Sequence, residues 1–443
     1  MPANMTSTYP FEPTPPWTTV NPKPFLPFRT RYDSEAPSLP SPRNEPFNDN
    51  YVVSTHLVPA GCPRLTPDIP LPVVPKFTTN AAERKRAVQQ LSTELMMRQE
   101  RFIRGELGGE RSEKPLWNCV NRYVKRAQDG RKGLTLFFTH ANGFPKEIWE
   151  ATLRYLLSSP TASLIDEVWS WEAVQHGDAA LVNETNLSGI FDWRDNARDI
   201  AHFLLYYLPE DTSSEVLPTH LQLLPEAIRE SRKIKGFSSR SLVTIGHSFG
   251  GCTSILAAVN FPALFSSIIL IDPVVVNGLN YSSNLTGLNS AALGRRERWP
   301  SREEALRSFK ASPFFRAWHP DTLQLYVTYG LCEDSQGGVK LKTSALHEAL
   351  VFVDHIGSNE AWELLEKVDE RIELRWIVPG KPEDKGCVTP SHKLYSTDVC
   401  FRIAGEKATR VRVWRRPVNS SNVVFHSAGH LVSRCFVSMY KFD

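Results

Sequence analysis

Short apolar runs alternate with longer amphipathic stretches through most of the chain from residue 134 onward. Apolar runs of this length, bounded by turn residues, are typical of strands buried in a parallel sheet. They cover residues 134–139, 165–171, 241–245, 267–271, 372–378 and 409–414. Stretches with the helical spacing of apolar residues lie between the first four runs, over 148–157, 195–208, 225–233 and 250–260. This alternation predicts an α/β fold with a mostly parallel central sheet and helices on both faces.

The part of the chain before residue 134 has a different pattern. Residues 1–49 carry many Pro, Ser, Thr and Asn with little periodicity, which predicts an extended tail. Of the 33 prolines, 18 lie within residues 1–76. A strand is predicted over 51–58, at the edge of the sheet, where neighbouring prolines are tolerated. Asn80 is a suitable cap for an amphipathic helix over 81–104, and a further strand is predicted over 116–124.

Residues 275–345 interrupt the alternation and are predicted to form a lid inserted into the domain. Residues 280–289 are polar and are expected to be a loop. The pattern at Ser301–Glu304 is a capping box, which predicts a helix over 302–311. The predicted organisation is therefore a tail (1–49), a first part of the core (50–274), the lid (275–345) and a second part of the core (346–443).

Composition and charge narrow the class of protein without identifying it. Lys and Arg number 51 against 48 Asp and Glu, so no strong field favours a nucleic acid as partner. No apolar window is long enough for a membrane span, and the first residues lack the pattern of a secretory signal. The seven scattered cysteines are then expected to be reduced thiols, and the last residues, Lys441–Asp443, are not an S-K-L-type address. We expect a cytoplasmic protein, and the sequence gives no prediction of its oligomeric state.

The strongest chemical signal is the sequence GHSFGG at Gly246–Gly251, between a predicted strand and a predicted helix. The pattern G-x-S-x-G in this context is the nucleophile elbow of the α/β-hydrolase fold, which exposes a serine at a sharp strand-to-helix turn. Gly246 and Gly250 avoid side chains that would collide at such a turn, and Gly251 allows the helix to pack closely. We therefore predict Ser248 as the nucleophile, with the helix N-terminus favouring the developing oxyanion.

A second signal is the loop at 140–145 (HANGFP), directly after the strand predicted over 134–139. In this fold, a loop at this place donates one backbone N–H to the oxyanion, and the residue after the nucleophile donates the other. We predict Asn142 and Phe249 as these donors, with either of the two residues after Asn142 as alternatives. His140 is expected to have a structural, hydrogen-bonding role.

The base should follow the last strand, where two histidines lie four residues apart, His426 and His430. No Glu follows the first histidine, so the H-E-x-x-H pattern is absent, and we predict neither a metal nor a cofactor. His430, preceded by Gly429 at the expected start of a helix, is the predicted base. His426 is expected to line the substrate pocket, together with Phe144 and His247.

The position of the acid is open between two places on the sheet. Asp272 follows the strand at 267–271, one strand away from the nucleophile. Glu383 or Asp384 follows the strand at 372–378, which is the more common place for the acid in this fold. Both choices keep the chain order nucleophile, acid, base, and both would hold and stabilise the imidazole in the same way.

An ordered set of motifs extends beyond the elbow. It comprises His140–Phe144, His176–Asp178, Asp192-Trp193, Arg198-Asp199, Gly246–Gly251, Asp272-Pro273, Trp299–Glu304, Tyr326–Gly330 and Gly429-His430. Over about residues 51–435 the chain thereby resembles fungal serine α/β-hydrolases of natural-product gene clusters, which include host-selective-toxin hydrolases and the acyl-CoA hydrolase of mycophenolic acid biosynthesis. In the mycophenolic-type enzyme the acid follows the strand after the nucleophile, so the resemblance implies Asp272.

The site residues and the resemblance together imply a serine hydrolase that cleaves an ester or thioester of a small hydrophobic metabolite through an acyl-enzyme. Acyl-CoA is one such thioester, and fungal secondary metabolism is the expected setting. The same triad could serve a transacylase, a cyclising thioesterase or a carbon–carbon bond hydrolase, and a non-catalytic ligand-binding protein is the alternative of a different class. Three lid arginines, Arg295, Arg296 and Arg298, are expected to form a solvated face, with contact to a CoA phosphate as the alternative.

Overall fold

A nine-stranded sheet organises the part of the chain that the computed structural model describes, residues 24–29, 36–74, 80–127, 132–275, 282–379 and 420–425. Its strand order is β1-β2-β3-β5-β4-β6-β7-β11-β12. Neighbouring strands from β5 to β12 in this order are parallel, whereas the pairs from β1 to β5 are antiparallel. The strands are β1 (Asn44–Pro46), β2 (Tyr51–Pro59), β3 (Trp117–Lys125), β4 (Leu134–Thr139), β5 (Ile165–Glu172), β6 (Ser241–His247), β7 (Ser267–Ile271), β11 (Glu373–Pro379) and β12 (Ser420–Phe425). The predicted mostly parallel sheet is confirmed.

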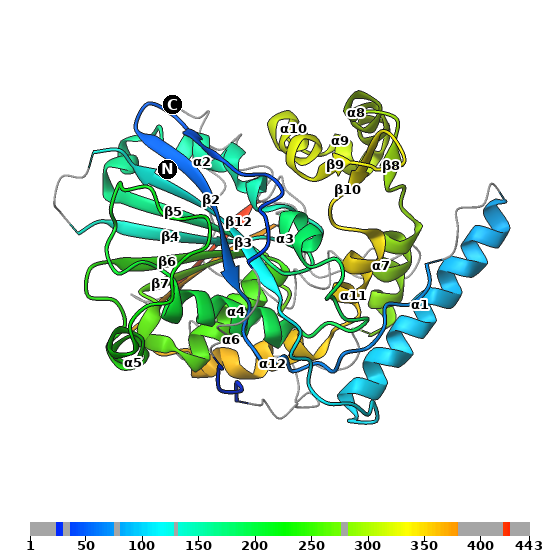
Figure 1. Cartoon of the computed structure of the whole chain (residues 1–443), viewed down its shortest axis with the longest axis horizontal. Coiled ribbons are helices and arrows are strands. Elements are labelled where there is room, and N and C mark those ends of the chain that lie inside the picture. The colour runs from blue at the N-terminus through cyan, green and yellow to red at the C-terminus, as the bar shows by residue number, and fades with distance from the viewer. Residues whose placement is uncertain are drawn as a thin grey trace.

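Helices cover both faces of this sheet. Successive side chains of a strand point to opposite sides, and those of the central strands are apolar on both sides, so each face needs a covering layer. In β4, Phe137 packs into the cluster under α4 (Trp193–Tyr206), α6 (Phe249–Asn260) and α12 (Ile356–Leu364). Its neighbours Leu136 and Phe138 pack on the other face against α2 (Glu150–Leu156). Figure 1 shows α4, α6 and α12 below the sheet and α2 above it. The shorter helices α3 (Gly177–Val182) and α5 (Glu226–Lys235) complete this layer arrangement.

The edge of the sheet differs from the prediction. The strand predicted at the edge, β2, is the second strand, and the edge position belongs to β1. β1 lies within the segment expected to be a tail. Phe47, which follows it, is buried in the cluster on the α2 side of the sheet. Pro46 fits the edge because an edge strand does not need every backbone N–H for pairing. The segment 36–49 therefore packs on the hydrolase-like core, which its polar composition did not indicate.

The inserted region after β7 builds a second, smaller layer, seen at the upper right of Figure 1. A three-stranded antiparallel sheet, β8-β10-β9, packs with three helices. These elements are β8 (Arg298–Trp299), α8 (Arg302–Ala311), α9 (Pro313–Arg316), α10 (Pro320–Tyr329), β9 (Leu331–Glu333) and β10 (Val339–Leu341). The capping box is confirmed, since the Ser301 hydroxyl accepts the Glu304 N–H at 3.2 Å and α8 covers the predicted residues.

One prediction for this region is wrong. Residues 280–289 were expected to be a loop, yet α7 (Ser282–Gly294) covers most of them. The helix packs between α1 (Ala81–Ile103) and α11 (Ala345–Phe352), and buried Ala292 and Leu293 join the main core. Buried Asn289 donates to the Ser92 hydroxyl of α1 at 3.1 Å. Tertiary packing here stabilises a helix whose Ser, Asn and Gly content gives it a weak intrinsic propensity.

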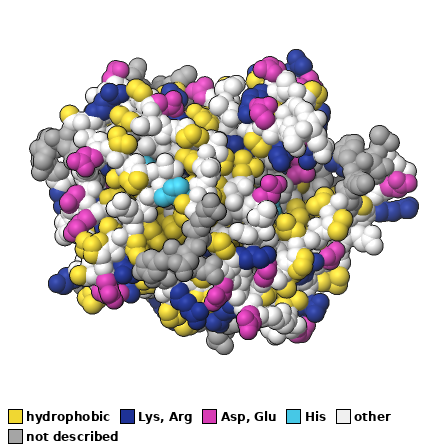
Figure 2. All heavy atoms as spheres, viewed as in Figure 1, with side chains coloured by type: hydrophobic (Ala, Val, Ile, Leu, Met, Phe, Trp, Pro, Cys, Tyr) yellow, Lys and Arg dark blue, Asp and Glu magenta, His cyan; other side chains and the backbone are white. Residues whose placement is uncertain are grey.

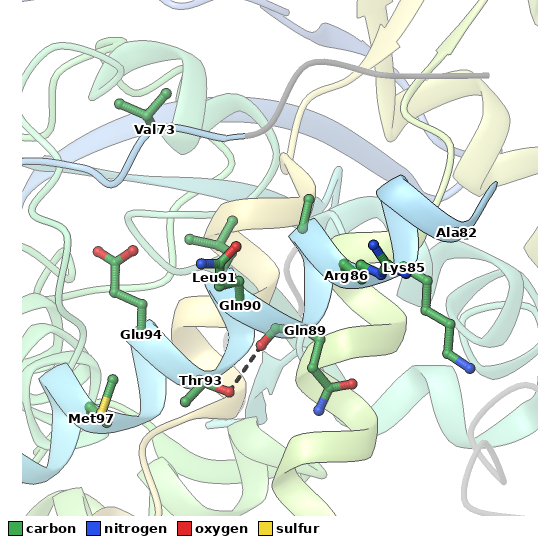
Figure 3. A pocket seen from close by; sticks show the side chains of 11 residues that line it. Val73, Ala82, Lys85, Arg86, Gln89, Gln90, Leu91, Thr93, Glu94 and Met97 are labelled. Carbon is green, nitrogen blue, oxygen red and sulfur yellow. Dashed lines mark hydrogen bonds between the residues drawn. The ribbon is translucent and has the colours of Figure 1, made fainter. Parts of the chain in front are cut away.

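Helix α1, capped by Asn80 as predicted, runs along the outside of the molecule at the right of Figure 1. An open cavity of about 950 Å³ lies along it, between Val73 and side chains that include Lys85, Arg86 and Glu94 (Figure 3). Within the described ranges, no helix has the length and apolar character needed to cross a membrane. On the face drawn in Figure 2, acidic and basic side chains are interspersed, and neither sign forms a continuous patch.

Candidate active site

Ser248 stands at the sharp turn between β6 and α6. Its backbone has φ 54° and ψ −117°, a strained conformation for a residue with a side chain, and the residue is 6% exposed. The turn is held because the Ser248 carbonyl accepts the N–H groups of Cys252 at 3.2 Å and Val274 at 3.1 Å. This is the elbow geometry predicted from the sequence, and the twelve-residue helix α6 begins directly behind the serine.

The elbow glycines are required by close backbone contacts. A Cβ atom at Gly246 would lie 2.6 Å from Gly251 Cα, and one at Gly250 would lie 2.6 Å from the carbonyl oxygens of Thr139 and His140. A Cβ atom at Gly251 would lie 2.9 Å from the Gly246 carbonyl oxygen. Real Cβ atoms do not approach backbone so closely, so the predicted roles of all three glycines are confirmed.

Asp272 emerges beside Ser248 at the same edge of the sheet. In the parallel register, His247 of β6 pairs with Ile271 of β7, so the two following residues are also neighbours. The Ser248 N–H donates to the Ile271 carbonyl at 3.1 Å, which ties the elbow to the strand end that carries the aspartate. Asp272 is 1% exposed and has φ 37°, a second positive angle for a residue with a side chain. Two strained residues thus lie at adjacent strand ends, a combination that is typical of functional sites.

The loop after β4 lies on the other side of the elbow. Asn142 is half-buried, and its side chain donates from Nδ2 to the Glu348 carbonyl oxygen at 3.0 Å. Its Oδ1 lies 3.0 Å from Nε2 of His176, at the start of α3. Phe249, the other predicted donor, is the first residue of α6 and is buried. The loop and the helix start therefore meet at one place, with His176 next to both.

His140 anchors the start of this loop. Its Nδ1 lies 2.8 Å from the Ala141 carbonyl oxygen and must carry the proton, because a carbonyl oxygen only accepts. Its Nε2 accepts the Ala173 N–H at 3.2 Å, and burial lowers the pKa of His140 to about 4. Both ring nitrogens of a neutral imidazole are used, so the expected structural role of His140 is confirmed.

The inserted layer closes over the loop through aromatic contacts. Phe144 packs edge-on against Trp318 and Tyr326, with ring centroids 5.4 and 6.1 Å apart. His247, the last residue of β6, packs instead against Trp149 on the α2 side of the sheet, with ring centroids 6.4 Å apart, and is 2% exposed. Phe144 thus joins the loop at 140–145 to the inserted layer, whereas His247 is buried on the α2 side of the sheet.

Four residues of the predicted site fall outside the described residues. They are the base His430, the pocket residue His426, and the alternative acids Glu383 and Asp384. The strand β12 ends at Phe425, directly before His426, and β11 lies between β12 and β7. The strand predicted over 409–414 also lies outside the described residues.

Two of the three arginines predicted to form a solvated face have carboxylate partners. Arg295 forms an ion pair with Glu348 and donates from Nη2 to the Thr343 carbonyl at 2.9 Å. Arg298 forms an ion pair with Asp334, and its side chain is about half exposed. Arg296 lies over the Trp299 ring and donates to the Arg298 carbonyl at 2.8 Å. Arg296 and Arg298 are exposed as expected, whereas the Arg295 side chain is only 22% exposed and departs from the predicted solvated face.

A buried ion-pair cluster at the end of the oxyanion loop was not predicted. Lys146 is fully buried, with Nζ at 2.8 Å from Asp178, 3.0 Å from Glu147 and 3.4 Å from Glu172. Burial opposes both charges, yet Lys146 and its neighbour Lys342 hold the pKa of Asp178 below its usual range. The motif at 176–178 was the available signal, because it places a glycine and an aspartate beside the loop.

Gly177 of this motif must be glycine. Its φ is +48°, and a Cβ atom would lie 1.9 Å from the Glu172 carboxylate. Within the described ranges, no group of three or more His, Cys, Asp or Glu side chains is placed to hold a metal ion. Of the described cysteines, Cys119, Cys252 and Cys332 are free thiols.

The peroxisomal α/β-hydrolase Lpx1 of Saccharomyces cerevisiae has a similar structure. The TM-score is 0.54 at 19% sequence identity, and the match covers 87% of this chain and 85% of that one. The chain has the α/β-hydrolase fold. The fold predicted from the strand–helix alternation and the elbow is therefore confirmed.

Sequence relatives of the chain include fungal proteins. The type I acyl-CoA thioesterase mpaH of Penicillium brevicompactum is 27% identical over 254 residues, which cover 51% of this chain and 52% of that protein. The abhydrolase domain-containing protein AFT2-1 of Alternaria alternata is 32% identical over 118 residues, which cover 25% of this chain and 44% of that protein. The chain spans about half the length of the curated relatives it matches. No protein-family model matches it, but the predicted resemblance to fungal α/β-hydrolases is confirmed.

Proposed function

We propose that this α/β-hydrolase is a serine hydrolase that cleaves an ester or thioester through an acyl-enzyme. The proposed triad is Ser248 as nucleophile, His430 as base and Asp272 as the acid that orients it. The observation that carries the proposal is the strained Ser248 turn, tied by backbone hydrogen bonds to the strand end and turn around Asp272. A structural role alone does not require a serine in such a conformation.

The proposed reaction gives each of these groups one role. Ser248 Oγ attacks the acyl carbon while His430 takes the hydroxyl proton, and the carbonyl oxygen becomes an oxyanion. The N–H groups of Phe249 and Asn142 receive the oxyanion, helped by the positive end of the α6 dipole. His430 then gives its proton to the departing alcohol or thiol. Water, deprotonated by His430, attacks the acyl-enzyme and releases the acid.

The proposed substrate is a small hydrophobic acyl group joined to an alcohol or to a thiol such as CoA. The aromatic side chains of the inserted region support an apolar acyl group, because Trp318 and Tyr326 pack directly on Phe144 beside the elbow. The names of the Penicillium relatives support a thioester, and we propose a role in fungal secondary metabolism on the same basis. We propose that residues 275–345 act as a lid that selects the acyl group.

The first test is covalent labelling together with a substrate panel. We expect a fluorophosphonate probe to label the purified protein and Ser248→Ala to lose both labelling and hydrolysis. The panel compares p-nitrophenyl esters with acyl-CoA thioesters, and addition of an alcohol acceptor distinguishes hydrolysis from acyl transfer by the product formed. Unchanged labelling of Ser248→Ala would exclude the proposed nucleophile. A folded wild type that neither reacts with the probe nor turns over any ester would favour a ligand-binding protein.

The second test separates the two positions for the acid. Asp272→Asn keeps the volume of the side chain but cannot stabilise the imidazolium, and we expect kcat to fall about 10⁴-fold. The control is the double variant Glu383→Gln/Asp384→Asn, which we expect to retain at least roughly a tenth of the wild-type kcat. The opposite ranking of the two variants would assign the acid to the segment that follows β11.

We also propose that the protein acts in the cytoplasm, and the free thiols of Cys119, Cys252 and Cys332 support a reducing compartment. The yeast relative is named a peroxisomal protein, which makes the peroxisome the competing location. Fluorescence microscopy of the tagged full chain beside a peroxisomal marker tests this. Overlap with the marker would contradict the proposal.

A further inference from the structure

The side chain of Asn142 has a fixed orientation, which determines what His176 must do. The Glu348 carbonyl oxygen only accepts hydrogen bonds, so the Asn142 atom at 3.0 Å from it must be the amide nitrogen. Asn142 Oδ1 therefore faces His176, and the His176 Nε2 at 3.0 Å from it must carry the proton. His176 is thus a donor to the residue whose backbone is proposed to receive the oxyanion.

The same imidazole ring also contacts the second proposed donor. His176 stacks on Phe249, with an interplanar angle of 22° and ring centroids 6.0 Å apart. His140 packs beside both rings, at 4.6 Å from His176 and 6.3 Å from Phe249. One side chain therefore touches both the loop after β4 and the first residue of α6.

The backbone holds His176 firmly at this place. Its N–H donates to the Ala173 carbonyl at 2.9 Å, and its carbonyl accepts the Ala180 N–H at 2.9 Å in the first turn of α3. The next residue, Gly177, donates its N–H to the Thr343 hydroxyl at 2.9 Å. His176 is completely buried, so its position does not depend on solvent.

We propose that His176 is a positioning residue that holds the two halves of the oxyanion hole in register, through its hydrogen bond to Asn142 and its stack on Phe249. The inference rests on the proposed function and goes beyond it, because it gives a role to a residue outside the proposed triad. Burial, together with the nearby His140, His347 and Arg295, keeps the pKa of His176 well below its usual range. The ring is therefore neutral at neutral pH, and its one N–H points at Asn142.

The consequence is an effect on kcat with little effect on KM. An oxyanion hole works when its donors are already at the position of the transition-state oxygen, and loss of one donor costs about 10²- to 10³-fold in rate. A displacement of about 1 Å is enough to cost about 10²-fold. The ground-state substrate binds mainly through its acyl group, so KM should change much less than kcat.

The experiment uses substitutions at position 176 with different remaining contacts. His176→Phe keeps an aromatic ring against Phe249 but removes the donor, and we expect kcat on p-nitrophenyl butyrate and the rate of fluorophosphonate labelling to fall about 100-fold. His176→Gln can place an amide N–H near the Nε2 position, and we expect it to recover to within about tenfold of wild type. The matched control is His202→Phe, another buried histidine, whose Nδ1 bonds the Pro59 carbonyl on the far side of α4.

A double-mutant cycle distinguishes positioning from general destabilisation. Asn142→Ala removes the same hydrogen bond from its other end, so the double variant Asn142→Ala/His176→Phe should be no slower than the slower single variant. Losses that multiply would show that the two residues act separately and would overturn the proposal. Wild-type kcat in His176→Phe, or an equal loss in His202→Phe, would also overturn it.

The outcomes also separate this proposal from the proposed function. A wild type that reacts with the probe while His176→Phe reacts equally fast removes the positioning role and leaves the hydrolase. A wild type without any labelling removes both. If His176→Phe does not fold, Asn142→Ala and His176→Gln still test the same hydrogen bond, and wild-type rates in both would overturn the proposal.

Discussion

Arg295 should accelerate the reaction by neutralising a carboxylate beside the oxyanion loop. A Cβ atom at Gly143 would lie 3.0 Å from the Glu348 carboxyl carbon, so this carboxylate is adjacent to the loop where negative charge is proposed to develop. Arg295 forms an ion pair with Glu348 and is 22% exposed. Arg295→Met keeps most of the length of the side chain and removes the positive charge. We expect the variant to stabilise the oxyanion less well and to acylate more slowly.

The size of the effect follows from Coulomb's law. For an oxyanion about 7 Å from the Glu348 carboxylate, an effective dielectric constant of about 20 gives a repulsion of about 2.4 kcal/mol. This corresponds to roughly 60-fold in rate. Arg295 is partly exposed, so water that fills the space left by its guanidinium will screen the repulsion. We therefore expect a loss of about 10- to 60-fold.

The assay measures kcat/KM on p-nitrophenyl butyrate and the rate of fluorophosphonate labelling in three variants. Arg295→Met should be slow, Glu348→Gln should be at least as fast as wild type, and the double variant should recover most of the loss. The Gln substitution leaves the backbone carbonyl that accepts from Asn142 in place. A double variant as slow as Arg295→Met would refute the electrostatic reasoning, because the loss of rate would then not depend on the charge of Glu348.

Three further predictions concern stability and the elbow. Gly250→Ala should reduce probe labelling and destabilise the fold by about 1–3 kcal/mol, because the added Cβ would collide with the Thr139 and His140 carbonyls. The control Gly287→Ala adds a Cβ with no atom within 4 Å and should be neutral or stabilising. Equal melting temperatures of the two variants would contradict this prediction. Lys146→Met should lower the free energy of unfolding in urea by about 3–5 kcal/mol, because buried carboxylates lose their ammonium partner; a loss below about 1 kcal/mol would contradict it. Burial lowers the pKa of His202 to about 3. The stabilising contribution of the neutral ring is therefore complete above about pH 6.5 and is lost as the pH falls toward 3, at roughly 1.4 kcal/mol per pH unit. His202→Asn keeps a donor for the Pro59 carbonyl and should remove this slope from the pH dependence of the free energy of unfolding in urea.

The elements that could be predicted from the sequence are those that local signals specify. The short apolar runs gave β4, β6 and β7 because buried parallel strands tolerate few polar residues. Side-chain caps gave the starts of α1 and α8, where Asn80 and Ser301 bond the first free N–H groups. The elbow was recognisable because its glycines, its serine and its flanking elements are consecutive in the chain.

The features that were missed depend on partners distant in the sequence. α7 has a weak helical propensity and gains its stability from α1 and α11, which lie far away along the chain. β1 has three exposed residues and no hydrophobic pattern, so only its pairing with β2 defines it. Lys146 has the composition of a surface residue, and its burial follows from carboxylates on two other elements. The site's Asn142 was recognisable as a loop residue, but its two side-chain partners were not.

The loop at 140–146, which carries the proposed oxyanion donor Asn142, is held by buried polar contacts along its whole length. His140 fixes its start through the Ala173 N–H, and Asn142 fixes its centre through His176 and Glu348. Lys146 fixes its end through Asp178 and Glu172. A hydrogen bond or ion pair in a low-dielectric interior defines direction as well as distance, which apolar packing does not. Such a loop would need no rearrangement when charge develops, so substitutions at its distant anchors should lower kcat without touching the substrate.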